Sequence, residues 1–153
     1  MPQRQREALL WDVLTILGDP DFGEVFGPGS QAEVALAAEL PPRSAREPHA
    51  VISGQVDRLV CGADATFIVD FKSGAAVPAS AEAAPMSYVA QLAAYRLVLT
   101  RLFPGKPVRA ALLWTEAPRL MEIPTAILNR GETLLYESMR SRHLDLPLPT
   151  PQL

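Results

Sequence analysis

Two β-rich runs in the middle of the chain, joined by one short turn, constrain the fold more than any other feature. Residues 51–61 and 66–72 are rich in Val, Ile and Phe, which favour strands. The four residues between them, 62–65, read Gly-Ala-Asp-Ala and are typical of a turn. The two runs therefore predict a β-hairpin, and the length of its turn predicts which residues face each other.

A four-residue turn places Cys61 opposite Thr66, and counting back along both strands places Asp57 opposite Asp70. Strand side chains alternate between the two faces of a sheet. We therefore expect the core on one face of the hairpin and a polar cluster, which includes Lys72, on the other. The expected core face carries Val56, Val60, Phe67, Val69 and Phe71, with Arg58 as its charged exception, and the expected polar face carries Gln55, Asp57, Leu59, Cys61, Thr66, Ile68, Asp70 and Lys72.

Two facing carboxylates are unfavourable without a counter-charge. Directly opposed side chains have Cβ atoms about 5 Å apart. At an effective dielectric constant of about 20, two unit charges at that separation repel by roughly 3 kcal/mol. Lys72 relieves part of this repulsion. A divalent cation between Asp57 and Asp70 would relieve more, and ligand sets made only of oxygen favour magnesium or manganese. A surface hairpin with solvated charges is the alternative for any one of these residues; their combination on one face favours a functional site.

Patterns on both sides of the hairpin predict an α/β fold (α+β), in which a mixed sheet is flanked by helices. The chain length of 153 residues suits a single domain over 1–153. Helical spacing or turn signals predict an amphipathic helix over 4–18, a short helical piece over 21–26, and helices over 86–103 and 125–143. A strand is predicted over 32–36, loops over 41–48 and 75–85, a second hairpin over 108–115 and 119–123, and a Pro-rich tail at the end.

Composition excludes several other classes of protein. Hydrophobic residues make up 48% and charged residues 20%, which is ordinary for a globular domain. No apolar run is long enough to span a membrane. The single cysteine, Cys61, cannot form an internal disulfide, a zinc site or an iron–sulfur cluster, so we expect a cytoplasmic protein. The net charge of -3 gives no overall attraction to nucleic acid, yet twelve of the fourteen basic residues are arginine, which suits phosphate contacts.

Three short segments in a fixed order resemble the RecB-type branch of the PD-(D/E)XK nucleases, with its restriction-endonuclease-like core. Residues 54–59 read Gly-Gln-Val-Asp-Arg-Leu, residues 68–74 read Ile-Val-Asp-Phe-Lys-Ser-Gly, and residues 91–96 read Gln-Leu-Ala-Ala-Tyr-Arg. With Ala-Glu-Val at 32–34 and the segment 104–115, the chain is similar to the C-terminal nuclease domain of AddA-type helicase-nuclease subunits, which act in double-strand-break repair. The similarity covers most of the chain.

This resemblance implies a metal-dependent DNA exonuclease that acts in break repair and recombination. It implies a catalytic set of Asp57, Asp70, Lys72, Gln91 and Tyr95, with Asp57, Asp70 and the carbonyl of Phe71 as ligands of Mg²⁺ or Mn²⁺. Lys72 would orient the attacking water and stabilise charge on the phosphate. Gln91 and Tyr95 are one helical turn apart and so can reach the same site.

The sequence departs from this branch in two ways. Its members usually carry a metal-binding histidine on a helix upstream of the sheet, and the predicted helix 4–18 has none. No phosphate-binding loop of a helicase motor occurs either. We therefore expect a C-terminal fragment of a larger helicase-nuclease that is weakly active or inactive alone. His49 and His143 lie outside the pattern, and we expect no catalytic role for them.

The resemblance also implies partners: DNA, the helicase portion of the same polypeptide and an AddB-like subunit. One alternative is a catalytically silent module of the same fold that binds DNA or holds a partner subunit; the intact Asp57, Asp70 and Lys72 speak against it. Another is a free-standing RecB-like nuclease, and a version with an iron–sulfur cluster is disfavoured by the missing cysteines.

Overall fold

A computed structural model describes residues 3–40, 42–44, 49–74 and 76–142 of the chain. His143, the Pro-rich tail and most of the predicted loop 41–48 lie outside the described residues. In the described part of the chain, no helix is long and apolar enough to cross a membrane.

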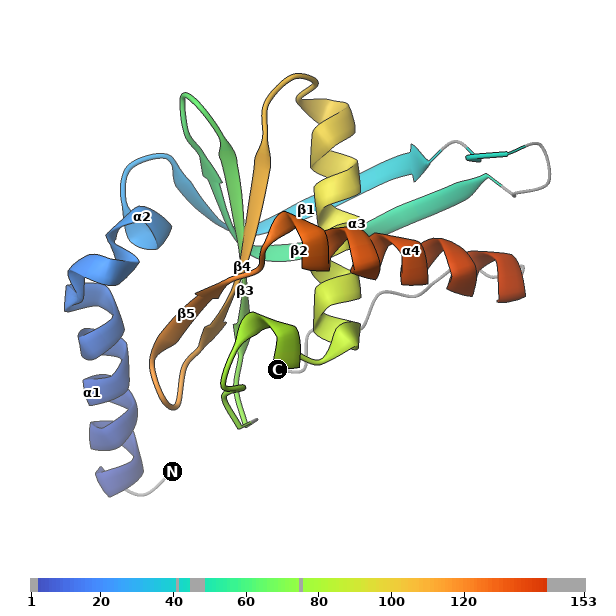
Figure 1. The fold of residues 1–153 in the computed structure, drawn as a ribbon. Helices are drawn as coiled ribbons and strands as arrows, with labels where there is room; N and C mark the ends of the chain where they lie inside the picture. Colours follow the sequence, from blue (N-terminus) through green and yellow to red (C-terminus); the bar gives the residue numbers. More distant parts are fainter. Residues whose placement is uncertain (1–2, 41, 45–48, 75, 143–153) are drawn as a thin grey trace.

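The described strands form one five-stranded sheet in the order β1-β2-β3-β4-β5 (Figure 1). Neighbouring strands are antiparallel except β3 and β4, which are parallel and are joined through a helix, as parallel pairs require. The mixed sheet predicted from the sequence is therefore confirmed. The strands are β1 (Ser30–Leu40), β2 (Ala50–Cys61), β3 (Thr66–Lys72), β4 (Val108–Trp114) and β5 (Arg119–Glu122).

Helices follow the predicted order and lie on both sides of the sheet (Figure 1). Two long helices cover one face, and α1 with α2 lies at the other. Strand β1 is longer than the predicted strand 32–36, and two short 3₁₀ helices, η1 and η2, were not predicted as such. The helical elements are α1 (Gln3–Gly18), η1 (Pro20–Phe22), α2 (Gly23–Phe26), η2 (Ala81–Ala83), α3 (Met86–Leu102) and α4 (Thr125–Arg142).

The prediction that one face of the hairpin is core is confirmed, but the prediction that the other face is polar is wrong for Leu59 and Ile68, because both faces are buried. Leu59 and Ile68, which were expected on the polar face, lie in the larger core beneath α3 and α4. Val60, Phe67 and Val69 lie in a smaller core beneath α1 and α2. Strand β3 is central in the sheet, and the crossover helix α3 covers its second face, as is usual where strands are parallel.

Strand β2 also departs from simple alternation next to Asp57. Val56 and Leu59 pack into the same core although they are an odd number of residues apart. The β1–β2 ladder pairs residues on either side of Glu33 and Asp57 but not these two residues with each other. Glu33 has a φ of 54°, in the left-handed region that non-glycine residues rarely adopt. The sheet is therefore locally distorted beside Asp57.

Helix α1 packs less than its predicted amphipathic pattern suggests. Ile16 is the buried residue of this helix. Its other large apolar side chains are exposed on the described structure: Leu9, Leu10, Trp11, Val13, Leu14 and Leu17.

Helices α3 and α4 approach each other closely at Gly131. A Cβ atom at this position would lie 2.9 Å from Val89 Cγ1 and 3.0 Å from both the carbonyl carbon and the carbonyl oxygen of Val89. Because Val89 is fully buried and two of these atoms are backbone, the neighbour cannot move aside cheaply. The absence of a side chain at Gly131 thus sets the spacing of the two helices.

We expect Gly131→Ala to destabilise the fold by about 1–3 kcal/mol through overpacking, partly offset by the roughly 1 kcal/mol by which alanine favours a helix. Gly18→Ala, at the end of α1 with nothing within 4 Å of the added Cβ, is the matched control and should be neutral or stabilising. Thermal or denaturant unfolding measures both. Equal stability of the two variants would contradict the close approach.

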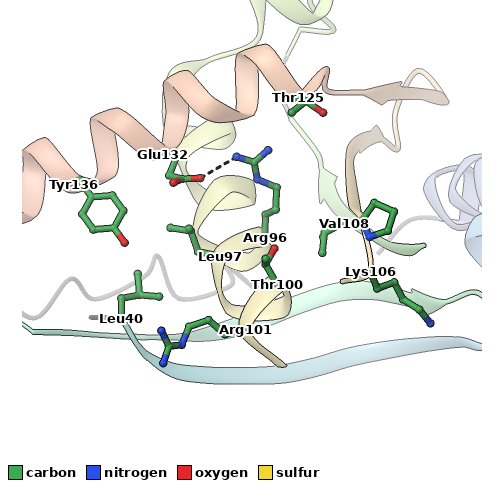
Figure 2. A pocket seen from close by; sticks show the side chains of 11 residues that line it. Leu40, Arg96, Leu97, Thr100, Arg101, Lys106, Val108, Thr125, Glu132 and Tyr136 are labelled. Carbon is green, nitrogen blue, oxygen red and sulfur yellow. Dashed lines mark hydrogen bonds and ion pairs between the residues drawn. The ribbon is translucent and has the colours of Figure 1, made fainter. Parts of the chain in front are cut away.

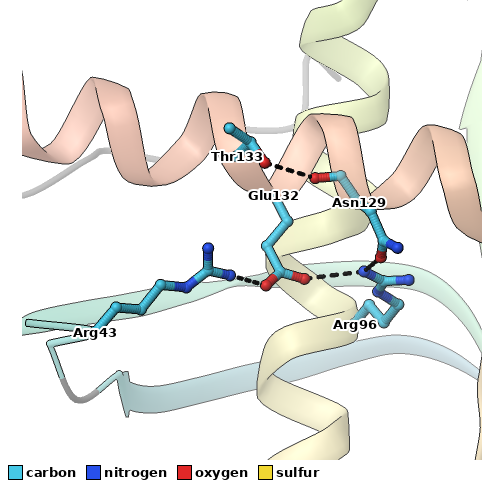
Figure 3. A network of polar contacts seen from close by, with 5 residues as sticks. All are labelled: Arg43, Arg96, Asn129, Glu132 and Thr133. Carbon is cyan, nitrogen blue, oxygen red and sulfur yellow. Dashed lines mark hydrogen bonds and ion pairs between the residues drawn. The ribbon is translucent and has the colours of Figure 1, made fainter.

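A polar network ties the connection after β1 to α4 and α3 (Figure 3). Arg96 donates to Asn129 Oδ1 at 2.6 Å and to Glu132 Oε2 at 2.9 Å, and Arg43 contacts the other oxygen of Glu132. The Arg43 guanidinium also lies 3.7 Å from the centre of the Tyr136 ring. The side chains of Arg96 and Glu132 are only 12% and 17% exposed, so Arg96 depends on Glu132 for its counter-charge.

Glu132→Gln is therefore expected to cost about 1–3 kcal/mol of folding free energy, because a mostly buried guanidinium loses its carboxylate. Glu7→Gln, the same substitution on the exposed surface of α1, should change stability by less than about 0.5 kcal/mol. Unfolding curves of the two variants check this. Identical midpoints would mean that the network contributes nothing.

Candidate active site

The hairpin has the register predicted from its turn. Cys61 pairs with Thr66, and the β2–β3 ladder continues to the pair of Arg58 with Val69. The ladder ends there, one step before Asp57 and Asp70. Asp57 instead reaches across with its side chain, whose Oδ2 accepts a hydrogen bond of 2.6 Å from the backbone N–H of Phe71.

Asp70 is the most deeply buried charged residue of the site, with 4% of its surface exposed. Burial raises the pKa of Asp70; Lys72 acts in the opposite direction, and the neighbouring Asp57 carboxylate raises the pKa further. The two aspartates are thus close enough to interact, on a face covered by α3.

Lys72 lies among three different partners. Its Nζ contacts Asp70 Oδ2, donates to Gln91 Oε1 at 3.1 Å, and lies 4.0 Å from the centre of the Tyr88 ring. The side chain is 14% exposed. An ammonium group enclosed in this way has one preferred position.

A chain of hydrogen bonds continues from Lys72 through α3 to β2. Gln91 Nε2 donates to the Tyr95 hydroxyl at 3.3 Å, and that hydroxyl donates to the carbonyl of Gln55 at 2.9 Å. Burial raises the pKa of Tyr95; the hydrogen bond from Gln91 opposes this, and the charges of Asp70 and Asp57 add to it. Tyr95 is therefore a neutral donor that fixes α3 against β2.

The structure thus brings together all five side chains of the predicted catalytic set, and Phe71 joins them through its N–H. The predicted set does not include Tyr88, whose ring contacts Lys72. The signal was available, because Tyr88 is one turn before Gln91 on α3 and hence on the same side of the helix. His49 contacts Glu39 at 2.8 Å on the exposed surface and takes no part in this set.

Asp57 and Asp70 suit a divalent cation, which this fold family implies. They supply neighbouring carboxylate oxygens. Burial, and to a smaller extent the Asp57 carboxylate, raises the pKa of Asp70, and a bound cation would favour the charged form of Asp70. The described residues contain no group of three His, Cys, Asp or Glu side chains that could hold a metal. The described side chains thus supply two carboxylates, and further ligands would be backbone carbonyl groups, such as that of Phe71, or water.

A cavity of about 520 Å³ lies elsewhere on the molecule (Figure 2). None of the predicted site residues lines it. Val108, which lines it, pairs with Thr66 at the start of β3, whereas Lys72 at the end of β3 pairs with Trp114. The cavity and the aspartates are therefore at opposite ends of the parallel strands. Lining side chains from α3 and α4 include Arg96, Thr100, Arg101, Glu132 and Tyr136.

Comparisons with solved structures show the fold. A crystal structure of a protein from Eubacterium rectale, described as a candidate exonuclease, superposes with a TM-score of 0.61 at 16% sequence identity, over 88% of this chain and 51% of that one. This chain therefore spans about half the length of that protein. The structure of a protein designated SSO0001 matches 88% of this chain and 63% of that one at 16% identity, with a TM-score of 0.45, too low to support an argument. No curated protein matches the sequence.

Sequence comparison places the chain in a family. The sequence profile of the PD-(D/E)XK nuclease superfamily matches residues 19–140, which include all five strands, α3, most of α4 and every residue of the site described above. Proteins of this superfamily generally use divalent metal ions. The chain belongs to the PD-(D/E)XK nuclease superfamily.

Proposed function

We propose that this chain is a DNA exonuclease module that depends on Mg²⁺ or Mn²⁺, with Asp57, Asp70, Lys72, Gln91 and Tyr95 as its active-site residues. One observation carries the proposal: Lys72 lies between the carboxylate of Asp70 and the amide of Gln91, beside Asp57. The likeness to an exonuclease candidate supports exonuclease rather than endonuclease activity.

Phosphodiester hydrolysis needs a polarised phosphate, an activated water and positive charge where negative charge develops. A divalent cation held by Asp57, Asp70 and the Phe71 carbonyl would supply the polarisation and the activated water. Lys72 supplies a positive charge and, beyond the N–H groups directed at Asp70 and Gln91, one N–H donor for a phosphate oxygen or the water. Gln91 holds the ammonium in place, and Tyr95 holds Gln91.

The test is cleavage of end-labelled linear DNA by the 153-residue chain with Mg²⁺, with Mn²⁺ and with a chelator. Because we expect the fragment alone to be weakly active at most, we expect slow, metal-dependent release of short products from linear DNA and none from a closed circle of the same sequence. Cleavage of the closed circle would show that the chain is an endonuclease and not an exonuclease. Metal-independent binding of DNA without cleavage would favour the catalytically silent module instead.

We further propose that the module acts with a DNA helicase motor and an AddB-like subunit, as the AddA-type resemblance implies, in break repair. Support comes from the order of its sequence segments, from 54–59 through 91–96 to 104–115. Affinity purification from the source cells with mass spectrometry tests this. We expect a helicase and an AddB-like protein, and recovery of the nuclease without either would favour a free-standing enzyme.

A further inference from the structure

The backbone at and after Lys72 is held by groups from the β4–β5 turn and from the first residue of β5. Thr115, directly after β4, donates its N–H to the carbonyl of Lys72 at 3.1 Å. Glu116 Oε1 accepts a hydrogen bond of 3.0 Å from the N–H of Gly74. Arg119, the first residue of β5, donates to two successive carbonyl groups, those of Pro78 and Ala79, each at 3.2 Å.

The segment between Lys72 and α3 packs against the larger core at Val77, Ala81 and Ala84, whereas residues 73, 74 and 76, next to Lys72, are exposed. Its side chains are mostly small, since residues 74–85 include six alanines and one glycine. Gly74 has a φ of 68°, and glycine loses more conformational entropy on folding than any other residue. The hydrogen bond from Glu116 therefore anchors the exposed part of the segment.

This segment matters because it joins the two halves of the site. Asp70 and Lys72 are at the end of β3, whereas Tyr88 and Gln91 are in the first two turns of α3. The Lys72 ammonium must meet Gln91 and the Tyr88 ring across this connection. A displacement of the backbone at Gly74 would also displace Lys72, which is two residues away.

We propose, on the basis of the proposed nuclease function, that Glu116 and Arg119 are positioning residues for this active site. They fix the backbone on both sides of the turn after Lys72 and so keep the end of β3 in the geometry that binds metal and phosphate. Glu116 accepts a hydrogen bond from the N–H of Gly74. Arg119 donates from both terminal nitrogens of its guanidinium to two successive carbonyl groups, which the single ammonium of lysine cannot reproduce.

Both side chains are exposed, which makes the proposal separable from a purely structural role. Exposed positions usually change global stability little, while a displacement of reacting groups by about 1 Å can cost up to about a hundredfold in rate. We expect Glu116→Ala and Arg119→Ala to lower kcat by about tenfold. KM for DNA should change by less than about twofold, and Tm by less than about 2 °C.

Conservative variants supply the decisive comparison. Glu116→Gln keeps the acceptor oxygen and should restore kcat, whereas Arg119→Lys should not. Asp64→Ala changes an exposed acidic residue of the β2–β3 turn and is the matched control, expected at wild-type kcat. Calorimetric titration with Mn²⁺ adds a readout that needs no cleavage: we expect Glu116→Ala to bind Mn²⁺ at least about threefold more weakly, with recovery in Glu116→Gln.

The outcomes separate this inference from the proposed function. Loss of kcat or of Mn²⁺ affinity in Glu116→Ala, restored by Gln and without a matching fall in Tm, upholds the positioning role. Wild-type kcat and wild-type Mn²⁺ affinity in both Glu116→Ala and Arg119→Ala would overturn the positioning role. A loss of kcat that parallels a fall in Tm and is not restored in Glu116→Gln would overturn it as well. If the wild-type chain binds Mn²⁺ but does not cut DNA, the nuclease function fails and the Mn²⁺ titration alone decides the positioning role.

Discussion

Lys72→Ala is expected to lower metal-dependent DNA cleavage by at least about a hundredfold, the range seen when one charge-stabilising donor is removed from an active site. Lys72 is the cation that contacts Asp70, and Gln91 and Tyr88 already hold it in place. Asp70→Ala should have an effect at least as large, because it removes a buried metal ligand of the proposed site. Rates at saturating Mn²⁺, with labelled linear DNA, measure both.

The other lysine of the chain provides the control. Lys106 donates to the carbonyl of Gly62 at 2.7 Å, at the opposite end of the strands from Asp70. Lys106→Ala should therefore retain cleavage. Melting curves recorded in parallel separate a lost function from a lost fold. Wild-type cleavage by folded Lys72→Ala would refute the assignment of the site.

Mn²⁺ is expected to stabilise the wild-type chain and to do little for Asp57→Asn. A ligand that binds only the folded state at a hundred times its Kd adds about 2.7 kcal/mol. For a domain of this size that amounts to a rise in Tm of roughly 5–10 °C. The asparagine removes one of the two charged ligands, so most of this rise should disappear. Thermal melts across a Mn²⁺ titration measure it.

Without metal, the same variant tests the repulsion between the two aspartates. The asparagine side chain can still accept the hydrogen bond from the N–H of Phe71. Burial still raises the pKa of Asp70, but the smaller contribution of the Asp57 charge is gone. We expect the metal-free stability of Asp57→Asn to lie within about 1 kcal/mol of wild type or above it. Asp57→Ala, which also loses the hydrogen bond, should be less stable than the asparagine variant. An equal metal response in wild type and Asp57→Asn would contradict a shared cation.

The register of the hairpin could be predicted from the sequence because it depends on local features. A four-residue turn and the alternation of side chains determine that Cys61 meets Thr66, and the structure has this pair. Gln91 and Tyr95 were placed together for a similar reason, since residues four apart lie on one side of a helix. Spacing within one element is a property of the chain alone.

The burial of the second face of the hairpin could not be predicted in the same way. Leu59, Ile68 and Asp70 looked like one side of a solvated sheet until α3 was placed over them. Burial depends on how elements pack together, and the residue pattern of a single strand does not show which element covers it. The distortion at Glu33 could not be predicted for the same reason, because it depends on the pairing of β1 with β2.

The kinds of residue in the candidate site and their order could be predicted from the sequence: two aspartates, a lysine, a glutamine and a tyrosine on predictable elements. How these side chains are held depends on the packing of the whole fold. Tyr88 lies against Lys72 because α3 crosses over β3, and Glu116 reaches Gly74 across 42 residues of sequence. Periodicity reports the geometry of single elements, whereas these contacts depend on how elements far apart in the chain pack together.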